Sequence, residues 1–310
     1  MNEHFIKDIE IKNFKCFKDF KAEGFGRVNL IGGKNNVGKT AFMEACYLGI
    51  SLYSKNQKTF KGLDIFDDTF VKDLKKKFNI LAFHRSPTDF FMNEKFSTPN
   101  YRSSIFTINE IEYSYEDDIN VKKDINAVIH NLTFISTIDI FNEQISDNIF
   151  KIKLLNKEDE LNSILNEIFN IEKVDVIRDR VIFKQNGEYR DLNQFGDGIK
   201  HFLHIILTLF LNQDSIVYLD EIENGIHYSN LDKLWEIVLK VSKKQSVQVF
   251  ATTHSKECIE SYARVAKELK DEEISFIKLG KNREDEIKAM VYPYDWFIDS
   301  IEQEEEVRGW

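Results

Sequence analysis

Eight residues near the N-terminus have the types and the spacing of a phosphate-binding loop. Residues 33–40 read GKNNVGKT, which fits the pattern of glycine, four residues, then Gly-Lys-Ser/Thr. Gly33 and Gly38 allow a tight wrap that points backbone N–H groups at a β-phosphate. Lys39 can reach the β- and γ-phosphates, and Thr40 can bind Mg²⁺. The residues predicted to hold the nucleotide are Gly33, Asn35, Asn36, Val37, Gly38, Lys39, Thr40 and Ala41.

The flanking elements support this reading of the loop. The apolar run 28–31 predicts a strand before it, and residues 41–48 predict a helix after it. Strand, glycine turn and helix are the context that the pattern needs, and the helix N-terminus adds favourable potential for an anion. The competing interpretation is a Gly/Asn turn that matches the pattern by chance.

Three further polar residues follow predicted buried strands. Asp220 and Glu221 end the apolar run 215–220, and His254 comes just after the run 247–251. In an open α/β sheet, groups at strand ends face the ligand. Asp220 could hold Mg²⁺ through water, Glu221 could polarise the attacking water, and His254 could contact the γ-phosphate. Taken singly, an acidic pair and a lone histidine are often structural, but a phosphate loop makes catalytic roles for Lys39, Glu221 and His254 the better interpretation.

A second glycine-rich segment precedes an apolar helix. Residues 194–198 read QFGDG and run into the predicted helix 199–211, which makes a second anion-binding helix terminus. A chain with one phosphate loop has little use for two such termini. We therefore expect Gln194, Gly196 and Gly198 to complete the site of a second copy, giving a head-to-tail homodimer with two nucleotides between the subunits.

In this order, the segments GKNNVGKT, QFGDGIK, IVYLDEIENGIH and ATTHS resemble the ATP-binding-cassette heads of the RecF/SMC type. More narrowly, the chain resembles the AAA ATPases of the OLD (overcoming lysogenization defect) family over nearly its whole length. The resemblance implies ATP and Mg²⁺ as ligands, a Walker A motif at 33–40 and a signature at 194–198. It also implies a Walker B motif ending at Asp220 and Glu221, a switch histidine at His254, and ATP-gated dimerisation coupled to DNA processing or anti-phage defence.

Two parts of the family pattern differ or are missing. Gln194 stands where the signature usually has serine, which predicts weaker or altered ATP-driven closure. A Q-loop glutamine has no clear position, and Gln144 and the residues near His84 and Arg85 are the candidates.

The remaining pattern predicts an α/β fold with a mixed, mostly parallel central sheet, an antiparallel β-subdomain and a helical insertion. Residues 5–11 and 104–115 alternate as strands do, and two strands before the loop predict an antiparallel start to the central sheet. Apolar residues at helical spacing predict a helix over 161–169. Short strands are expected at 174–177 and 180–183, with a turn at Asn186-Gly187. Further elements are expected as a helix over 231–241 and strands over 274–279 and 287–291.

Length and composition limit the alternatives. At 310 residues and 42% hydrophobic content, we expect one ATPase domain, with lobes at about 1–53 and 191–310 and an inserted region at about 54–190. The net charge of −10 excludes an overall basic footprint, so DNA binding is expected only within a complex, although residues 75–77 are a local basic run. Three unpaired cysteines, no signal peptide and no membrane span predict a cytoplasmic protein.

OLD proteins commonly carry a TOPRIM nuclease after the ATPase, and residues 261–310 are too few for one. The Glu-x-Lys triplets at Glu10 and Glu286 are better explained as exposed faces of strands. We therefore expect any nuclease or toxin to be a separate subunit bound to this chain.

Two other functions remain open at this point. Residues 156–159 read NKED, which matches the guanine-reading motif of GTPases, but they also make a good helix start with Asn156 as cap. A nucleotide-sensing scaffold, whose slow hydrolysis only times the release of a partner, is the alternative from a different class.

Overall fold

The computed structural model describes residues 6–56, 104–108, 111–115, 120–121, 132–136, 142–178 and 180–303, and the side chains of 48–56 and 104–144 are not described. The basic run 75–77 and the Q-loop candidates near His84 lie outside these residues. Gln144, the other candidate, lies in a helix, and its side chain is among those not described.

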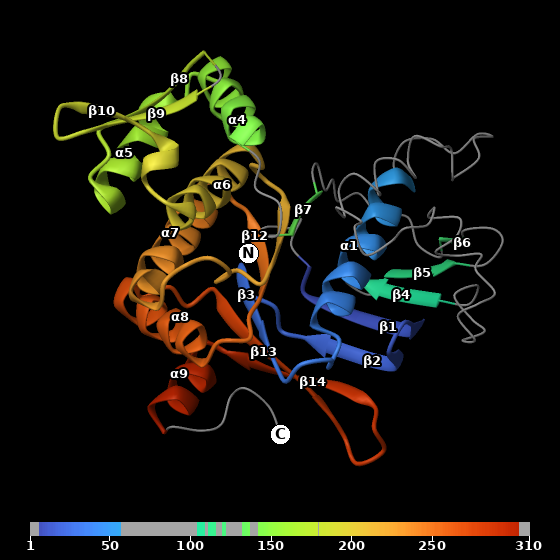
Figure 1. Cartoon of the computed structure of the whole chain (residues 1–310). Helices are drawn as coiled ribbons and strands as arrows, with labels where there is room; N and C mark the ends of the chain where they lie inside the picture. The colour runs from blue at the N-terminus through green and yellow to red at the C-terminus, as the bar shows by residue number, and fades with distance from the viewer. Residues whose placement is uncertain are drawn as a thin grey trace.

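A six-stranded sheet organises the molecule, in the order β14-β13-β3-β12-β11-β7 (Figure 1). Five of its strands are parallel, and only the edge strand β14 runs antiparallel, to β13. The strands are β3 (Val28–Gly32), β7 (Leu132–Ser136), β11 (Ile216–Asp220), β12 (Gln248–Thr252), β13 (Ile274–Lys281) and β14 (Ile287–Pro293). The predicted parallel core is therefore confirmed.

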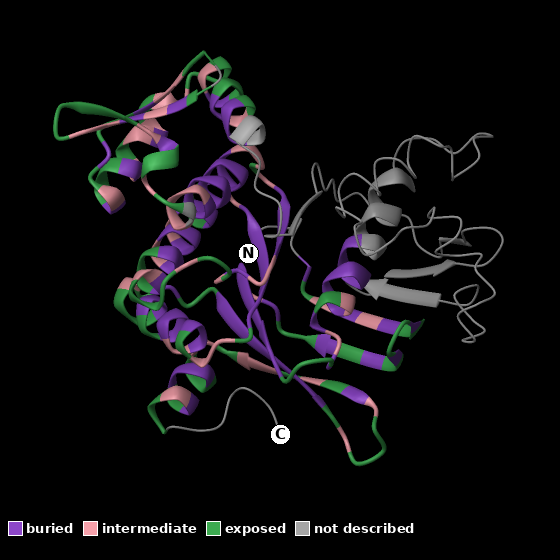
Figure 2. Cartoon of the chain, viewed as in Figure 1, coloured by how far each residue is buried: buried purple, intermediate pink, exposed green. Residues whose placement is uncertain are grey.

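The apolar runs of the central strands become buried because both faces of the sheet are covered. Successive side chains of a strand point to opposite faces, so each strand feeds two hydrophobic cores. In β11, Val217 and Leu219 enter one core, while Ile216 and Tyr218 enter the other. Figure 2 shows the result: β3 and β12 are buried along their whole length, and β11 is buried up to its last residue, Asp220.

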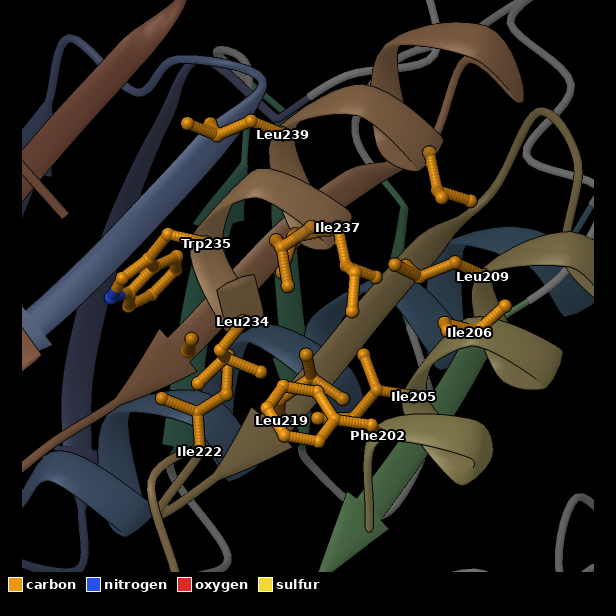
Figure 3. Packing of buried hydrophobic residues seen from close by; sticks show 14 of the residues in the cluster. Phe202, Ile205, Ile206, Leu209, Leu219, Ile222, Leu234, Trp235, Ile237 and Leu239 are labelled. Atoms are coloured by element: carbon orange, nitrogen blue, oxygen red, sulfur yellow. The ribbon is translucent and has the colours of Figure 1, made fainter. Parts of the chain in front are cut away.

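Several helices line one of these cores, and within the described residues one long helix lies in the other. Helices α6 (Asp197–Leu211), α7 (Leu231–Lys244), α8 (Lys256–Leu269) and α9 (Tyr294–Glu302) supply the first core, together with alternate residues of the sheet. Figure 3 shows Phe202 and Ile205 of α6 meeting Leu219 of β11 and Leu234 of α7 in this core. Helix α1 (Lys39–Asn56) packs on the opposite face.

The first two strands of the chain form a separate antiparallel sheet, so the expectation that they begin the central sheet is wrong. The sheet has the order β2-β1-β4-β5-β6 and lies beside α1. Its strands are β1 (Asp8–Phe14), β2 (Phe17–Glu23), β4 (Ser104–Ile108), β5 (Ile111–Tyr115) and β6 (Asn120–Val121). Pairing of β1 with β2 and β4 uses both of its edges, so β3 is left to pair within the central sheet.

Residues 142–191 form a small unit of two helices and a meander. Helices α4 (Asn142–Leu154) and α5 (Glu158–Phe169) pack against strands β8 (Lys173–Ile177) and β9 (Arg180–Gln185), and β10 (Glu188–Asp191) pairs with β9 at the edge of the meander. Leu161, Leu165 and Ile168 form the buried stripe of α5, as its periodicity predicts. Asn186 and Gly187 both have positive φ, as the predicted two-residue hairpin turn requires. In the described part of the chain, no helix is long and apolar enough to cross a membrane.

Candidate functional site

The phosphate loop has the backbone that its glycines predict. Gly33 has a φ of 147°, and a Cβ added there would lie 2.5 Å from the carbonyl oxygen of Leu279. Gly38 has a φ of 86°, and its added Cβ would lie 2.7 Å from Cys16 Sγ. A larger residue would meet both strain and collision, so the tight wrap between β3 and α1 depends on these two glycines.

Lys39, the first residue of α1, turns back over the loop. Its side chain is buried, and its Nζ donates hydrogen bonds to the carbonyl oxygens of Gly33 at 2.7 Å and Lys34 at 2.9 Å. Burial lowers the pKa of Lys39, and the nearby carboxylates of Asp220, Glu223 and Glu221 oppose that shift. The ammonium therefore lies between the loop carbonyls and the acidic strand end, where a phosphate group could bind.

Thr40 and Asp220 bring two oxygen ligands together from different strand ends. Thr40 Oγ1 lies 3.3 Å from Asp220 Oδ2. Mg²⁺ prefers oxygen ligands and is usually held by one or two protein groups together with substrate phosphates and water. The two side chains fit such an ion, and no cluster of three or more His, Cys, Asp or Glu ligands occurs among the described residues.

Glu221 follows Asp220 in a strained turn. Its φ is 48°, in the left-handed region that non-glycine residues adopt at a cost on the order of 1–3 kcal/mol. Thr252 of the neighbouring strand fixes this conformation: its Oγ1 accepts the Glu221 N–H at 2.8 Å and donates to Asp220 Oδ1 at 2.5 Å. Thr252 thus positions both acids, and sequence analysis did not identify it.

His254 lies beside Glu221, with its Nε2 atom 3.6 Å from Glu221 Oε1. Glu223 holds the loop that carries it. Glu223 Oε1 accepts hydrogen bonds from Thr253 Oγ1 at 2.8 Å, from the His254 N–H at 2.9 Å and from the Ser255 N–H at 3.2 Å. Sequence analysis missed Glu223 because a glutamate in a polar turn carries no pattern of its own.

The signature segment, residues 194–198, lies in a different layer from the phosphate loop. Helix α6 belongs to the core on one face of the sheet, whereas α1 belongs to the core on the other. Gly196 caps α6 with a φ of 78°, and a Cβ added there would meet nothing within 4 Å. Gln194 is exposed in the short 3-10 turn η2 (Leu192–Gln194) before the helix. The structure therefore brings Lys39, Thr40, Asp220, Glu221 and His254 to one place and leaves the signature open.

The motif at residues 156–159 lies near the amino ends of the parallel strands, opposite to the phosphate loop. Lys157 Nζ contacts Gln213 Oε1 and Gln245 Oε1, which precede the amino ends of β11 and β12. The phosphate loop follows the carboxyl end of β3, which is parallel to them, so this motif cannot read a base held by the loop. The expected cap is also wrong: Lys157 is the N-cap of α5 and makes no side-chain cap hydrogen bond, while Asn156 has a φ of 53°. The first turn of α5 is acidic, with Glu158, Asp159 and Glu160.

Comparison with known proteins gives related sequences and folds. Residues 54–260 match the family model "AAA domain, putative AbiEii toxin, Type IV TA system". An "ATP/GTP phosphatase" of Helicobacter pylori is 27% identical over 328 residues, covering 85% of this chain and 89% of that protein. The "DNA replication and repair protein RecF" of Clostridium botulinum (strain Langeland) is 24% identical, covering 80% of this chain and 70% of RecF.

Among solved structures, the SMC head domain of Thermotoga maritima aligns with a TM-score of 0.54 at 13% identity, covering 93% of this chain and 98% of that chain. An SMC head bound to the C-terminal winged-helix domain of ScpA aligns with a TM-score of 0.53 at 13% identity and the same coverage. These likenesses confirm the RecF/SMC-type fold that the sequence motifs predict. The family match spans well over half of the chain, so the chain belongs to this AAA domain family and is an ATPase of the AAA and ABC type.

Proposed function

We propose that this chain binds and hydrolyses ATP in a head-to-tail homodimer with two composite sites. The observation that carries the proposal is the arrangement of the two glycine-rich segments. The glycines and Lys39 of the phosphate loop pack against their own chain, whereas Gly196 is open on the other face of the same sheet. A second copy could therefore supply its residues 194–198 to the nucleotide on residues 33–40.

Each side chain of the site has a role in the transfer of the γ-phosphoryl group to water. Lys39 and the loop N–H groups bind the β- and γ-phosphates, and Glu221 accepts the proton of the attacking water. His254, held by Glu223, orients that water or contacts the γ-phosphate. Thr40 and Asp220 would hold Mg²⁺, which neutralises charge on the phosphates when bound. Because phosphoryl transfer depends mainly on positioning and charge, Thr252 and Glu223 contribute by orienting the acidic pair and the His254 loop.

We further propose that ATP-driven closure controls a separate nuclease or toxin subunit in DNA processing or anti-phage defence, in the cytoplasm. RecF is named for DNA replication and repair, an SMC head binds ScpA, and the family description refers to a toxin–antitoxin system. The chain's charge of −10 favours DNA contact only through such a complex. Tight, salt-sensitive DNA binding by the isolated chain in filter-binding assays would contradict this part of the proposal.

The trapped dimer tests the central proposal. Glu221→Gln removes the proton acceptor but keeps the shape, so ATP should remain bound and the dimer should accumulate. We expect light scattering to show twice the monomer mass with ATP and Mg²⁺, and turnover about a thousandfold lower. Glu188→Gln, on the exposed strand β10, is the control and should leave turnover unchanged. A Glu221→Gln chain that stays monomeric with ATP would contradict the composite site.

The same assay separates this proposal from a nucleotide-sensing scaffold. The half-exposed Glu221 carboxylate beside His254 favours hydrolysis as the working step. A scaffold predicts that slow hydrolysis only times partner release, so a turnover-dead Glu221→Gln chain would hold its partner without releasing it. Partner release at an unchanged rate in Glu221→Gln would contradict the scaffold.

A further inference from the structure

The signature helix holds the turn that carries the predicted catalytic glutamate. His201, on the first turns of α6, is buried, and its Nε2 atom lies 3.0 Å from the backbone carbonyl oxygen of Ile222. A carbonyl oxygen only accepts hydrogen bonds, so Nε2 carries the proton and donates. Helix and turn also approach closely at Gly198, where an added Cβ would lie 3.4 Å from the Gly225 carbonyl oxygen. The first turns of α6 and residues 222–225 therefore form one contact.

The position of Glu221 depends on this contact. Ile222, the next residue, is held from two sides, because its N–H donates to the Thr252 carbonyl oxygen at 3.0 Å and its own carbonyl accepts from His201. Its side chain is fully buried in the core between the sheet and helices α6 and α7 (Figure 3). A left-handed residue such as Glu221 keeps its conformation only when its neighbours fix it. A shift of α6 would therefore move Glu221 through the Ile222 peptide.

The same helix contains an internal control. His204 lies one turn after His201 and is also buried, but its Nδ1 atom has no hydrogen-bond partner within the described part of the chain. Burial lowers the pKa of both imidazoles, that of His204 to about 4, so both side chains are neutral near pH 7. The two histidines share residue type, helix and burial, and the hydrogen bond to the Ile222 carbonyl oxygen distinguishes His201.

We propose that His201 is a positioning residue that couples the signature helix of each subunit to its own Glu221. This inference rests on the proposed composite site, in which that helix contacts the nucleotide bound by the partner. When α6 contacts the nucleotide bound by the partner, His201 fixes the position of the Ile222 peptide. That peptide in turn fixes the position of Glu221. Hydrolysis at one site then depends on occupancy of the other.

Three variants test the coupling in the full chain. His201→Leu keeps volume and removes the donor, whereas His201→Gln keeps an N–H donor of similar reach. His204→Leu is the matched control. We expect His201→Leu to lower kcat about 5- to 10-fold with little change in KM, and to reduce the Hill coefficient for ATP from about 2 toward 1. His201→Gln should restore most of both, and His204→Leu should leave both near the wild-type values.

Other results would overturn the proposal in recognisable ways. Unchanged kcat in His201→Leu, or equal losses in His201→Leu and His204→Leu with equal falls in melting temperature, would show that the imidazole only packs. Loss of ATP-driven dimerisation in His201→Leu alone would show that it shapes the signature rather than Glu221. A wild-type chain that stays monomeric with ATP would contradict the composite site itself, and that failure appears before any variant is compared.

Discussion

The phosphate loop and the signature segment are both glycine-rich turns that lead into helices, yet they differ in how closely the rest of the chain packs around them. Atoms of Leu279 and Cys16 surround the glycines of the loop, and its lysine is buried against loop carbonyls. The glycine of the signature has open space where a side chain would be, and Gln194 beside it is exposed. In the proposed composite site, the enclosed half is the phosphate loop, whose glycines and lysine pack against their own chain, and the displayed half is the signature segment, which is exposed.

This difference explains how one fold can respond to a nucleotide. A fully enclosed site would bind ATP without changing any surface, whereas a site that is half displayed can gain contacts only from a second molecule. ATP binding energy can then stabilise the dimer, because the ligand interacts more favourably with the closed state than with the open one. Substitutions in the two halves should therefore impair different properties: nucleotide binding and stability in one, and ATP-driven dimerisation in the other.

The largest effect is expected in the enclosed half. Lys39→Ala removes the cation aimed at the β- and γ-phosphates, so nucleotide affinity and turnover should fall about a hundredfold or more. Lys34→Ala, an exposed side chain in the same loop, is the control and should change affinity by a few-fold at most. Binding is measured by calorimetry with ATP, and turnover by phosphate release. Unchanged turnover in Lys39→Ala would overturn the whole scheme.

A pair of glycine substitutions tests the comparison itself. Gly33→Ala forces a Cβ against the Leu279 carbonyl, so it should reduce the free energy of unfolding by about 2 kcal/mol or more. Gly196→Ala meets no atoms, so it should cost less than Gly33→Ala, on the order of 1–3 kcal/mol for a backbone conformation (φ 78°, ψ 171°) that is almost confined to glycine. It should still lower turnover, because in the proposed dimer the Gly196 N–H faces the partner's nucleotide. Urea unfolding and turnover assays measure the two effects, and equal stability losses would contradict the distinction.

The strand-end network should give an intermediate effect. Thr252→Val keeps shape but removes the hydroxyl that joins Asp220 to the Glu221 N–H, so kcat should fall about tenfold. Thr253→Val is the matched variant, since its hydroxyl donates to Glu223 instead, and a smaller loss is expected there. Steady-state kinetics at saturating ATP and Mg²⁺ compare them. A larger loss for Thr253→Val would show that the His254 loop, rather than the acid pair, limits the rate.

The smallest effect is expected in the displayed half. Gln194→Ser replaces the unusual signature residue with the one that the resemblance implies, and the side chain is exposed, so stability should not change. A shorter hydroxyl donor should favour closure and lower the ATP concentration for half-maximal dimerisation by about two- to fivefold. Light scattering during ATP titration measures this. Weaker dimerisation in Gln194→Ser would mean that the amide is adapted to this interface.

Local patterns predicted most of the fold, because buried positions are apolar and recur at the spacing of a strand or a helix. The runs at β3, β11 and β12 are apolar on both faces, and the phosphate loop needs Gly33 and Gly38 where they stand. Alternation over residues 5–11 indicated a strand, β1, but could not say which sheet it joins, since pairing is decided by distant segments. The contacts of Glu223 cross between elements and leave no spacing to find.

The structure of Glu221→Gln with ATP and Mg²⁺ is the most direct test of the composite site. The account predicts each ATP between residues 33–40 of one copy and residues 194–198 of a second, with Thr40 and Asp220 of the first copy beside the metal. ATP enclosed by one chain alone, or a dimer formed through another surface with Gly196 still open to solvent, would contradict it.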